Sequence, residues 1–262
     1  MKFNAHAMGA LHGVQYTNSL EAFRHWYSRG VRHFEVDVNM TSDGAFVLSH
    51  DIQRVAKQTK KEFLADRRVG MLDSAVMDGT PMDLQYGFDL LFRYPDVNFM
   101  FDFQPVSFSV EGDKVGLLKK FSREFRDANI CQRSLIEVGS IEHAKVVQDS
   151  GYRNVQLWIG KGDELYDMSK VEVLLNHGIK FVSLDPRCIT KEYVAALKGA
   201  GVTVYSCGYD EYRGCSRALQ IGLDFATMHY PFYRSGHVLG YVGWRMYKKF
   251  PRLAGFCEWG FL

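Results

Sequence analysis

The stretch from 33 to 51, HFEVDVNMTSDGAFVLSHD, contains two carboxylates two residues apart, Glu35 and Asp37. In a β-strand, residues two apart point to the same face, so these carboxylates share one face and Val36 and Val38 take the other. Two carboxylates on a buried face repel each other and lose hydration unless a cation or a proton compensates. An oxygen-liganded divalent metal ion would meet that requirement, and so would pairing with arginines in a polar layer.

A third carboxylate, Asp102, lies near the end of another apolar run, NFMFDFQP. Three carboxylates at one edge of a sheet suit Mg²⁺ or Ca²⁺ better than zinc, which prefers more histidine or cysteine. His6 and His50 also end apolar runs. Two histidines beside a metal ion could act as general acid and general base, although a histidine at a strand end often only bonds a loop.

Short runs rich in Val, Ile, Phe and Tyr predict the strands that would position these side chains. They are Phe3–Met8, His33–Asn39, Asn98–Phe103, Ser134–Val138, Asn154–Ile159, Phe181–Asp185, Val202–Cys207 and Phe225–His229. Helical periodicity lies between them, at Ser19–Arg29, Met82–Tyr94, Gly116–Asn129, Ile141–Ser150, Ser169–His177, Lys191–Gly199 and Glu211–Ile221. A glycine follows several of these helices, which is a common helix stop.

Alternation of strands and helices with short connections predicts a parallel sheet with helices outside it. Eight strands in 262 residues favour closure into a (β/α)8 TIM barrel. We expect one domain over 1–262, with a polar, irregular excursion at Ile52–Thr80 after the second strand. The aromatic and basic segment 232–262 is predicted to hold the last outer helix and a tail. That tail could instead contact a membrane surface peripherally or a second subunit.

The composition excludes several other classes of protein. With 32 basic and 30 acidic residues the net charge is +2, which argues against a nucleic-acid protein with a basic face. Five widely spaced cysteines indicate reduced thiols rather than a disulfide framework. The N-terminal residues lack the apolar core of a signal peptide, and no stretch has the apolar length of a membrane span, so we expect a cytoplasmic protein.

The spacing of these motifs resembles the glycerophosphodiester phosphodiesterase family, which belongs with the phosphatidylinositol-specific phospholipase C-like TIM barrels. The family's opening pattern is H-R-G, P-E-N-T-L-x-A-F, E-x-D and K-D-G-x-x-V-x-H-D. Here HAMG, YTNSLEAF, EVD and SDGAFVLSHD stand in the same order, and FMFDF supplies the third acidic strand end. At the eighth predicted strand, ATMHYP stands where the family often has T-D-x-P.

The resemblance implies a phosphoric diester hydrolase in which His6 and His50 are the catalytic acid–base pair. It implies that Glu35, Asp37 and Asp102 bind one divalent cation, Mg²⁺ or Ca²⁺. In this family a substrate hydroxyl beside the phosphate can attack phosphorus, and water then opens the cyclic intermediate. The expected substrate is a small or lipid-derived phosphodiester of lipid metabolism.

The chain departs from the family pattern at two cations that would hold the phosphate. The arginine beside the first histidine is Ala7, and the lysine two residues after the third acid is Gln104. Other residues could bind the substrate instead, namely His12, Asn18, Glu137, Lys161 and Asp185. An ion pair is the alternative role for Glu137 and Asp185, and a solvated surface charge is the alternative for Lys161.

The predicted function is metal-dependent hydrolysis of a glycerophosphodiester-like substrate. Two alternatives stay open. One is a phospholipase C- or D-like enzyme that acts on a lipid headgroup or a cell-surface polymer. The other is a non-catalytic barrel that binds phosphorylated ligands, because Ala7 and Gln104 replace cations of the pattern.

Overall fold

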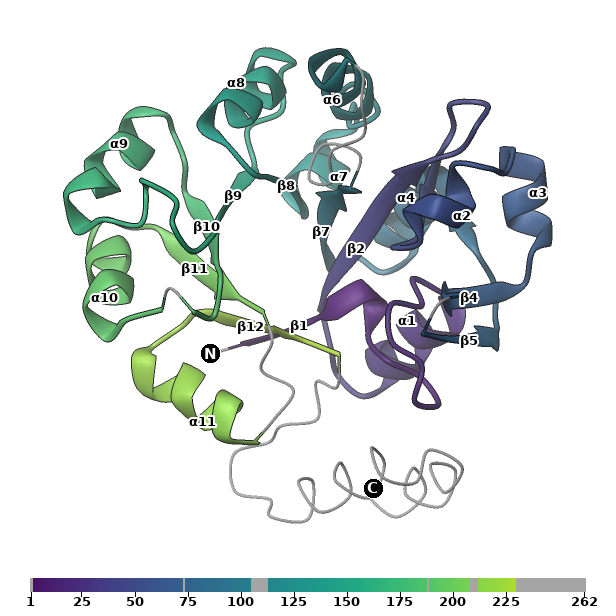
Figure 1. Ribbon diagram of the computed structural model, residues 1–262, viewed down its shortest axis with the longest axis horizontal. Helices are drawn as coiled ribbons and strands as arrows, with labels where there is room; N and C mark the ends of the chain where they lie inside the picture. Colours follow the sequence, from purple (N-terminus) through teal and green to yellow (C-terminus); the bar gives the residue numbers. More distant parts are fainter. Residues whose placement is uncertain (1, 73, 105–112, 188, 208–211, 230–262) are drawn as a thin grey trace.

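Eight parallel strands close into a barrel with helices around it (Figure 1), which confirms the predicted (β/α)8 TIM barrel. The computed structural model describes residues 2–72, 74–104, 113–187, 189–207 and 212–229, with only the backbone of 212–216. The strands follow the order β1-β12-β11-β10-β9-β8-β7-β2, and β1 also pairs with β2 to complete the ring. Their bounds are β1 (Lys2–Ala5), β2 (His33–Met40), β7 (Asn98–Phe103), β8 (Ser134–Val138), β9 (Val155–Ile159), β10 (Phe181–Leu184), β11 (Thr203–Ser206) and β12 (Phe225–Met228).

The outer layer consists of helices that link successive strands. They are α1 (Leu20–Ser28), α4 (Leu84–Arg93), α6 (Lys114–Ser122), α7 (Ala128–Gln132), α8 (Ile141–Asp149), η2 (Met168–Lys170), α9 (Val171–Asn176), α10 (Lys191–Gly199) and α11 (Tyr212–Ile221). Side chains of Ser19, Asp83 and Thr190 accept a backbone N–H at the starts of α1, α4 and α10. Glycines with positive φ follow α1 and α10, as predicted from Gly30 and Gly201.

The excursion after β2 includes the predicted segment Ile52–Thr80 but extends beyond it at both ends, and it is regular rather than irregular. It contains β3 (Phe46–Leu48), α2 (Ile52–Val55), α3 (Lys60–Ala65), β4 (Arg68–Met71), β5 (Ala75–Asp78) and β6 (Met82–Asp83). β3 folds back antiparallel on β2, and β4 and β5 form a separate antiparallel pair. A capping box between Thr59 and Glu62 starts α3. These elements have two to six residues, too few to show a clear hydrophobic period.

Two predicted boundaries were wrong. The first strand ends at Ala5 rather than Met8, because the chain turns there into a short 3-10 helix, η1 (His6–Met8). The predicted helix Gly116–Asn129 is two helices, since α6 ends at Ser122 and α7 starts only after Asp127. The Asp127 side chain accepts the N–H of Asn129, and this new cap marks the break.

The strands present different chemistry on their two faces. On β2, Val36 and Val38 are fully buried in the apolar core between the strands and the helices. Glu35 and Asp37 take the alternate positions and face the inside of the barrel, where they are 3% and 1% exposed. The core therefore lies between sheet and helices, and the barrel interior at the carboxyl ends of the strands is left for polar groups.

Some predictions from the sequence concern residues that the structure does not describe. The predicted outer helix and tail at 232–262, with their proposed membrane contact, fall outside the described residues. Of the cysteines whose side chains the structure describes, Cys131 and Cys207 are free thiols. Among the described helices, the chain has none long and apolar enough to cross a membrane.

Helix α1 fixes the start of the loop that follows η1. The Trp26 indole N–H donates to the carbonyl of Ala10 at 2.9 Å, and Trp26 is 1% exposed. Gly9, at φ 88°, packs so closely on this indole that a Cβ there would stand 2.2 Å from Trp26 Cδ1. Only glycine meets both the backbone and the space requirement at this position.

We predict that Gly9→Ala destabilises the protein more than Gly30→Ala, although both glycines have φ near 90°. Alanine at Gly9, whose φ of 88° and ψ of 157° lie in a region open almost only to glycine, costs about 1–3 kcal/mol in backbone strain, and the clash with Trp26 adds about 1–3 kcal/mol. Alanine at Gly30 carries only the cost of its positive φ, about 1–2 kcal/mol. Nothing lies within 4 Å of a Cβ at Gly30. Urea unfolding of both variants measures the difference, and equal losses would contradict the packing argument.

Candidate active site

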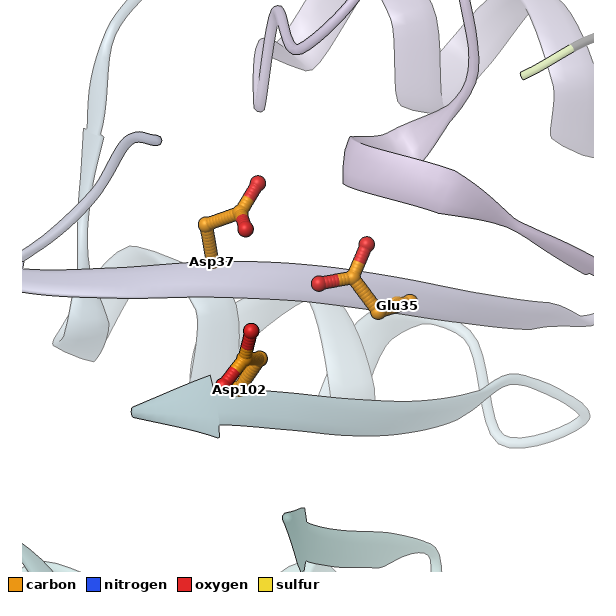
Figure 2. A group of neighbouring side chains, drawn as sticks. All are labelled: Glu35, Asp37 and Asp102. Atoms are coloured by element: carbon orange, nitrogen blue, oxygen red, sulfur yellow. The ribbon is translucent and has the colours of Figure 1, made fainter. Parts of the chain in front are cut away.

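Three carboxylates converge at the carboxyl ends of two adjacent strands. Figure 2 shows Glu35 and Asp37 on the same side of β2, with Asp102 beside them on β7. Asp37 and Asp102 are register partners in the sheet. One oxygen from each of the three carboxylates lies within 4.8 Å of the other two. The face shared by Glu35 and Asp37, inferred from strand spacing, is therefore present, and Asp102 reaches the same place.

Neutral hydrogen-bond donors hold this cluster. The backbone N–H of Ala7 donates to Glu35 at 2.5 Å. Asn18 donates its side-chain amide to Asp37 at 2.8 Å and accepts the backbone N–H of Asp37 at 3.0 Å. Gln104 donates to Asp37 at 3.0 Å and also to Asp102. These donors orient the carboxylates but bring no positive charge. The alternative left open by the sequence was pairing with arginines, and these contacts are not of that kind.

Burial and mutual repulsion raise the pKa values of several carboxyl groups at this site. Burial raises the pKa of Glu35 well above its usual value, and the charges of Asp37 and Asp102 raise it further. Burial also raises the pKa of Asp37 to about 7, although the hydrogen bond from Asn18 opposes this shift. Glu137, the register partner of Asp102, has its pKa raised to about 8 by burial and then by the charge of Asp102. The cluster therefore favours a bound proton or a cation.

The donor set fits a hard divalent cation. All three side chains offer carboxylate oxygens, which Mg²⁺ and Ca²⁺ prefer, and they lie close enough together to share one ion. A divalent cation would remove the repulsion that raises the proton affinities of these carboxylates.

His6 lies directly against the acidic cluster. Its Nε2 atom is 3.8 Å from a carboxylate oxygen of Glu35. Burial lowers the pKa of His6 well below its usual value, and the nearby imidazoles of His229 and His50 lower it further. His6 and His50 therefore lie near enough to influence each other, and both stand at the mouth of the barrel where the sequence predicted them.

Two residues of this site were missed in the sequence. The ring of His229, just after β12, stacks on His6 with centroids 4.3 Å apart. The Tyr16 ring contacts His6, His50 and His229, with centroid distances of 5.2, 4.4 and 4.6 Å. His229 closes the eighth strand, as His6 and the acids close theirs, and that position was the available signal. No local pattern marks Tyr16.

The loop between η1 and α1 holds an unusual backbone. Five non-glycine residues from η1 to the start of α1 have positive φ: Ala7 and Met8 in η1, and His12, Tyr16 and Asn18 in the loop. Such conformations are costly for residues with a Cβ and cluster at functional sites. Here they accompany the Ala7 N–H that reaches Glu35, the Tyr16 ring between the histidines and the Asn18 amide on Asp37.

The five predicted substrate-binding residues do not form one group. Asn18 orients Asp37, as described above. His12 lies exposed in the turn between Leu11 and Val14, where its charge contributes after burial and Arg29 to the lowered pKa of His25. His12 therefore lies near His25 of α1.

Glu137, Asp185 and Lys161 lie across the barrel from the histidines. Glu137 faces the interior and accepts a hydrogen bond from Gln156 at 2.7 Å. Asp185 is bound by the Arg187 guanidinium through both oxygens, and this contact holds the pKa of the carboxyl below its usual value. Lys161 is exposed and adds a smaller effect on Asp185. The ion pair left open for Asp185 is thus present.

Comparison with known proteins identifies the motif set. Residues 8–87 match the model of the Glycerophosphoryl diester phosphodiesterase family, which confirms the resemblance found in the sequence. The matched range includes Glu35, Asp37 and His50, and His6 and Asp102 lie outside it. The predicted phosphoric diester hydrolase agrees with this match. Comparison with curated proteins finds no significant sequence match.

Solved structures show the same barrel. A glycerophosphodiester phosphodiesterase from Parabacteroides distasonis is 16% identical, with a TM-score of 0.67 over 88% of this chain and 93% of that one. A phosphodiesterase from Oleispira antarctica, solved with the product sn-glycerol-3-phosphate, is 16% identical, with a TM-score of 0.62 over 88% and 94%. A glycerophosphodiester phosphodiesterase from Agrobacterium tumefaciens is 14% identical, with a TM-score of 0.61 over 88% and 97%. At these identities the similarity establishes the fold.

We predict that the metal-free protein loses stability as the pH rises. Asp37 and Glu137 have folded pKa values of about 7 and about 8, above their ordinary values of 3.8 and 4.5. Between about pH 6.5 and pH 8, above the ordinary pKa of histidine, these two carboxyls keep protons in the folded state that the unfolded state has already lost, so deprotonation favours unfolding there. Below about pH 6.5, His6 and His25, whose pKa values are lowered by burial, act in the opposite direction. Urea unfolding in EDTA across the upper of these two ranges measures the effect, and a stability that rises with pH there would contradict it.

We predict that Glu35→Gln raises the melting temperature in EDTA, because it removes one buried like charge. The same variant should lose the stabilisation that Mg²⁺ or Ca²⁺ gives the wild type. Glu142→Gln, at an exposed position on α8, is the matched control and should change neither quantity. Thermal unfolding with and without the ions decides this, and the same ion-induced shift in Glu35→Gln and wild type would argue against a metal at this cluster.

Proposed function

We propose, from the match of residues 8–87 to the Glycerophosphoryl diester phosphodiesterase family model, that this chain hydrolyses a glycerophosphodiester-like substrate with a divalent metal ion. The observation that carries the proposal is the convergence of His6 and Glu35, 3.8 Å apart, with Asp37 and Asp102 at one barrel mouth. Carboxylates for a cation and imidazoles for proton transfer are the groups that phosphodiester cleavage requires.

Glu35, Asp37 and Asp102 would hold the ion, which supplies positive charge to the phosphate and lowers the pKa of an attacking hydroxyl. Ala7 and Asn18 would orient these carboxylates, because the Ala7 N–H donates to Glu35 and the Asn18 amide donates to Asp37.

His6 and His50 would carry the protons. One imidazole takes the proton of the attacking hydroxyl, and the other gives a proton to the departing alcohol oxygen. Tyr16 contacts both rings and so would keep them oriented. The single-domain organisation over 1–262 and the cytoplasmic location stay predictions beside this proposal.

The site also bears on the alternative of a non-catalytic binding barrel. Buried carboxylates destabilise a fold that does not use them, and replacing them would relieve the repulsion shown by the raised pKa of Glu35. Retention of all three acids with both histidines supports catalysis. A phospholipase-like activity on a lipid headgroup needs the same groups, so the substrate panel below separates it from hydrolysis of small diesters.

We predict metal-dependent hydrolysis of bis(p-nitrophenyl) phosphate and of one or more glycerophosphodiesters. His6→Ala and His50→Ala should each lower kcat/KM roughly 10²–10⁴-fold, because each removes one proton-transfer group. His177→Ala, at an exposed position after α9, is the control and should leave the rate unchanged. Rates are measured with Mg²⁺, with Ca²⁺ and with EDTA, on small diesters and on phospholipid vesicles.

Turnover by the wild type that persists in both histidine variants would contradict the assigned roles. A folded protein that binds glycerol 3-phosphate and hydrolyses nothing with either ion would favour the binding barrel. Hydrolysis confined to vesicles would favour the phospholipase alternative.

A further inference from the structure

A second polar surface lies across the barrel mouth from the histidines. It is formed by inward-facing side chains near the carboxyl ends of β8, β9 and β10: Glu137, Gln156, Trp158 and Ser183. Glu137 is the register partner of Gln156, and Ser183 is the partner of Trp158. We call these four residues the β8–β10 wall. The alternate residues of the same strands, such as Leu157 and Val182, are buried in the core towards the helices.

Gln156 provides a hydrogen-bond acceptor that is buried and unused within the described structure. Its side chain is fully buried, and its amide donates to Glu137 at 2.7 Å and contacts Met100 Sδ at 2.8 Å. Among the described residues its carbonyl oxygen has no hydrogen-bond partner. Because a buried polar atom without a partner is costly, a donor from outside the described residues is expected at this oxygen. A ligand hydroxyl is such a donor.

Trp158 provides an exposed aromatic surface above Gln156 on the same strand. The side chain is 38% exposed, whereas Trp26 is 1% exposed and bonded to Ala10. The six-membered ring of Trp158 lies where a side chain at Gly160 would stand, with a Cβ there only 2.4 Å from Cη2. Gly160 thus leaves room for the indole. Two residues along a strand are about 6.6 Å apart, close to the width of a six-membered ring with its hydroxyls.

The two charges nearest the wall neutralise each other, and the exposed Lys161 adds a weaker positive charge near them. Asp185 and Arg187 form a bidentate pair, with Arg187 Nη2 2.5 Å from an Asp185 oxygen. The wall therefore offers one indole, one amide oxygen, one carboxyl group and the hydroxyl of Ser183, which bonds Glu137. Quaternary ammonium groups are bound by several aromatic rings around the cation, and this wall has one. A flat ring with hydroxyls at its edge matches both the indole and the polar groups beneath it.

We propose that the β8–β10 wall binds a six-membered polyhydroxylated ring, a sugar or a cyclitol, as one alcohol of the phosphodiester. The ring stacks on Trp158, and its hydroxyls bond Gln156 and Glu137 while the phosphate lies towards His6 and the acids. This inference rests on the proposed function, since it names the alcohol of the bond to be cleaved.

Binding of phosphorylated alcohols to the wild type with Mg²⁺ tests the wall without turnover. The probes are glucose 1-phosphate, inositol 1-phosphate, glycerol 3-phosphate and phosphocholine, measured by calorimetry. We expect one of the two ring phosphates to bind at least roughly tenfold more tightly than glycerol 3-phosphate, since glycerol has hydroxyls but no ring to stack on Trp158. The two ring probes separate a sugar from a cyclitol. Equal or tighter binding of glycerol 3-phosphate or phosphocholine would overturn the proposal.

Variants at Trp158 assign the preference to the wall. Trp158→Ala should weaken ring-phosphate binding roughly tenfold or more and leave glycerol 3-phosphate binding unchanged, while Trp158→Phe retains most of the preference. Phe92→Ala, which removes an aromatic that is 49% exposed on α4, is the matched control. Equal effects of Trp158→Ala on all probes, or none, would overturn the assignment. Trp158→Phe supplies the answer if the alanine variant unfolds.

The outcomes for the two proposals are separable. The protein could show a ring preference that depends on Trp158 and yet hydrolyse no diester. That result would support the proposed binding of a ring at the β8–β10 wall and reject the proposed hydrolase activity. Turnover of bis(p-nitrophenyl) phosphate without a ring preference would retain the hydrolase and reject the wall.

Discussion

The mutual repulsion of Glu35, Asp37 and Asp102 is the constraint on which the rest of this barrel mouth depends. Three carboxylates within 4.8 Å, two of them almost fully buried, cannot all be charged without compensation. The surrounding donors come from Ala7 in η1, from Asn18 in the loop after it, and from Gln104 after β7. The strained backbone of that loop is thus explained by the carboxylates that it must reach.

Strand periodicity was enough to predict the eight strands, their closure and the shared face of Glu35 and Asp37. It worked because the outward residues are continuous apolar runs and the acids interrupt them only on the inner face. It failed for short elements and for the break before Asp127, where a local cap overrides the helical pattern. Tyr16 was missed because its position depends on a left-handed backbone, which no residue pattern announces.

Ala7 and Gln104, the two departures from the family pattern, both contact the acidic cluster. Ala7 contacts the cluster through its backbone, because its N–H donates to Glu35. Gln104 bridges Asp37 and Asp102 with a neutral amide, where a lysine would have brought a positive charge. Less positive charge around the carboxylates leaves more of the compensation to a bound ion. His229, stacked on His6, adds a donor in the region of the lost cations.

The barrel closes by pairing β1 with β12, and the side chains of Asn4 and Thr227 bond across 223 residues of sequence. Contacts between such distant residues form late and slowly, because the whole intervening chain must be collected first. His6 follows the first of these strands and His229 the last. During synthesis, His6 therefore emerges from the ribosome long before the residue that stacks on it. Pairing of β12 with β1 therefore also brings His229 onto His6, so a chain translated only as far as β7 carries the acids without this stacked pair.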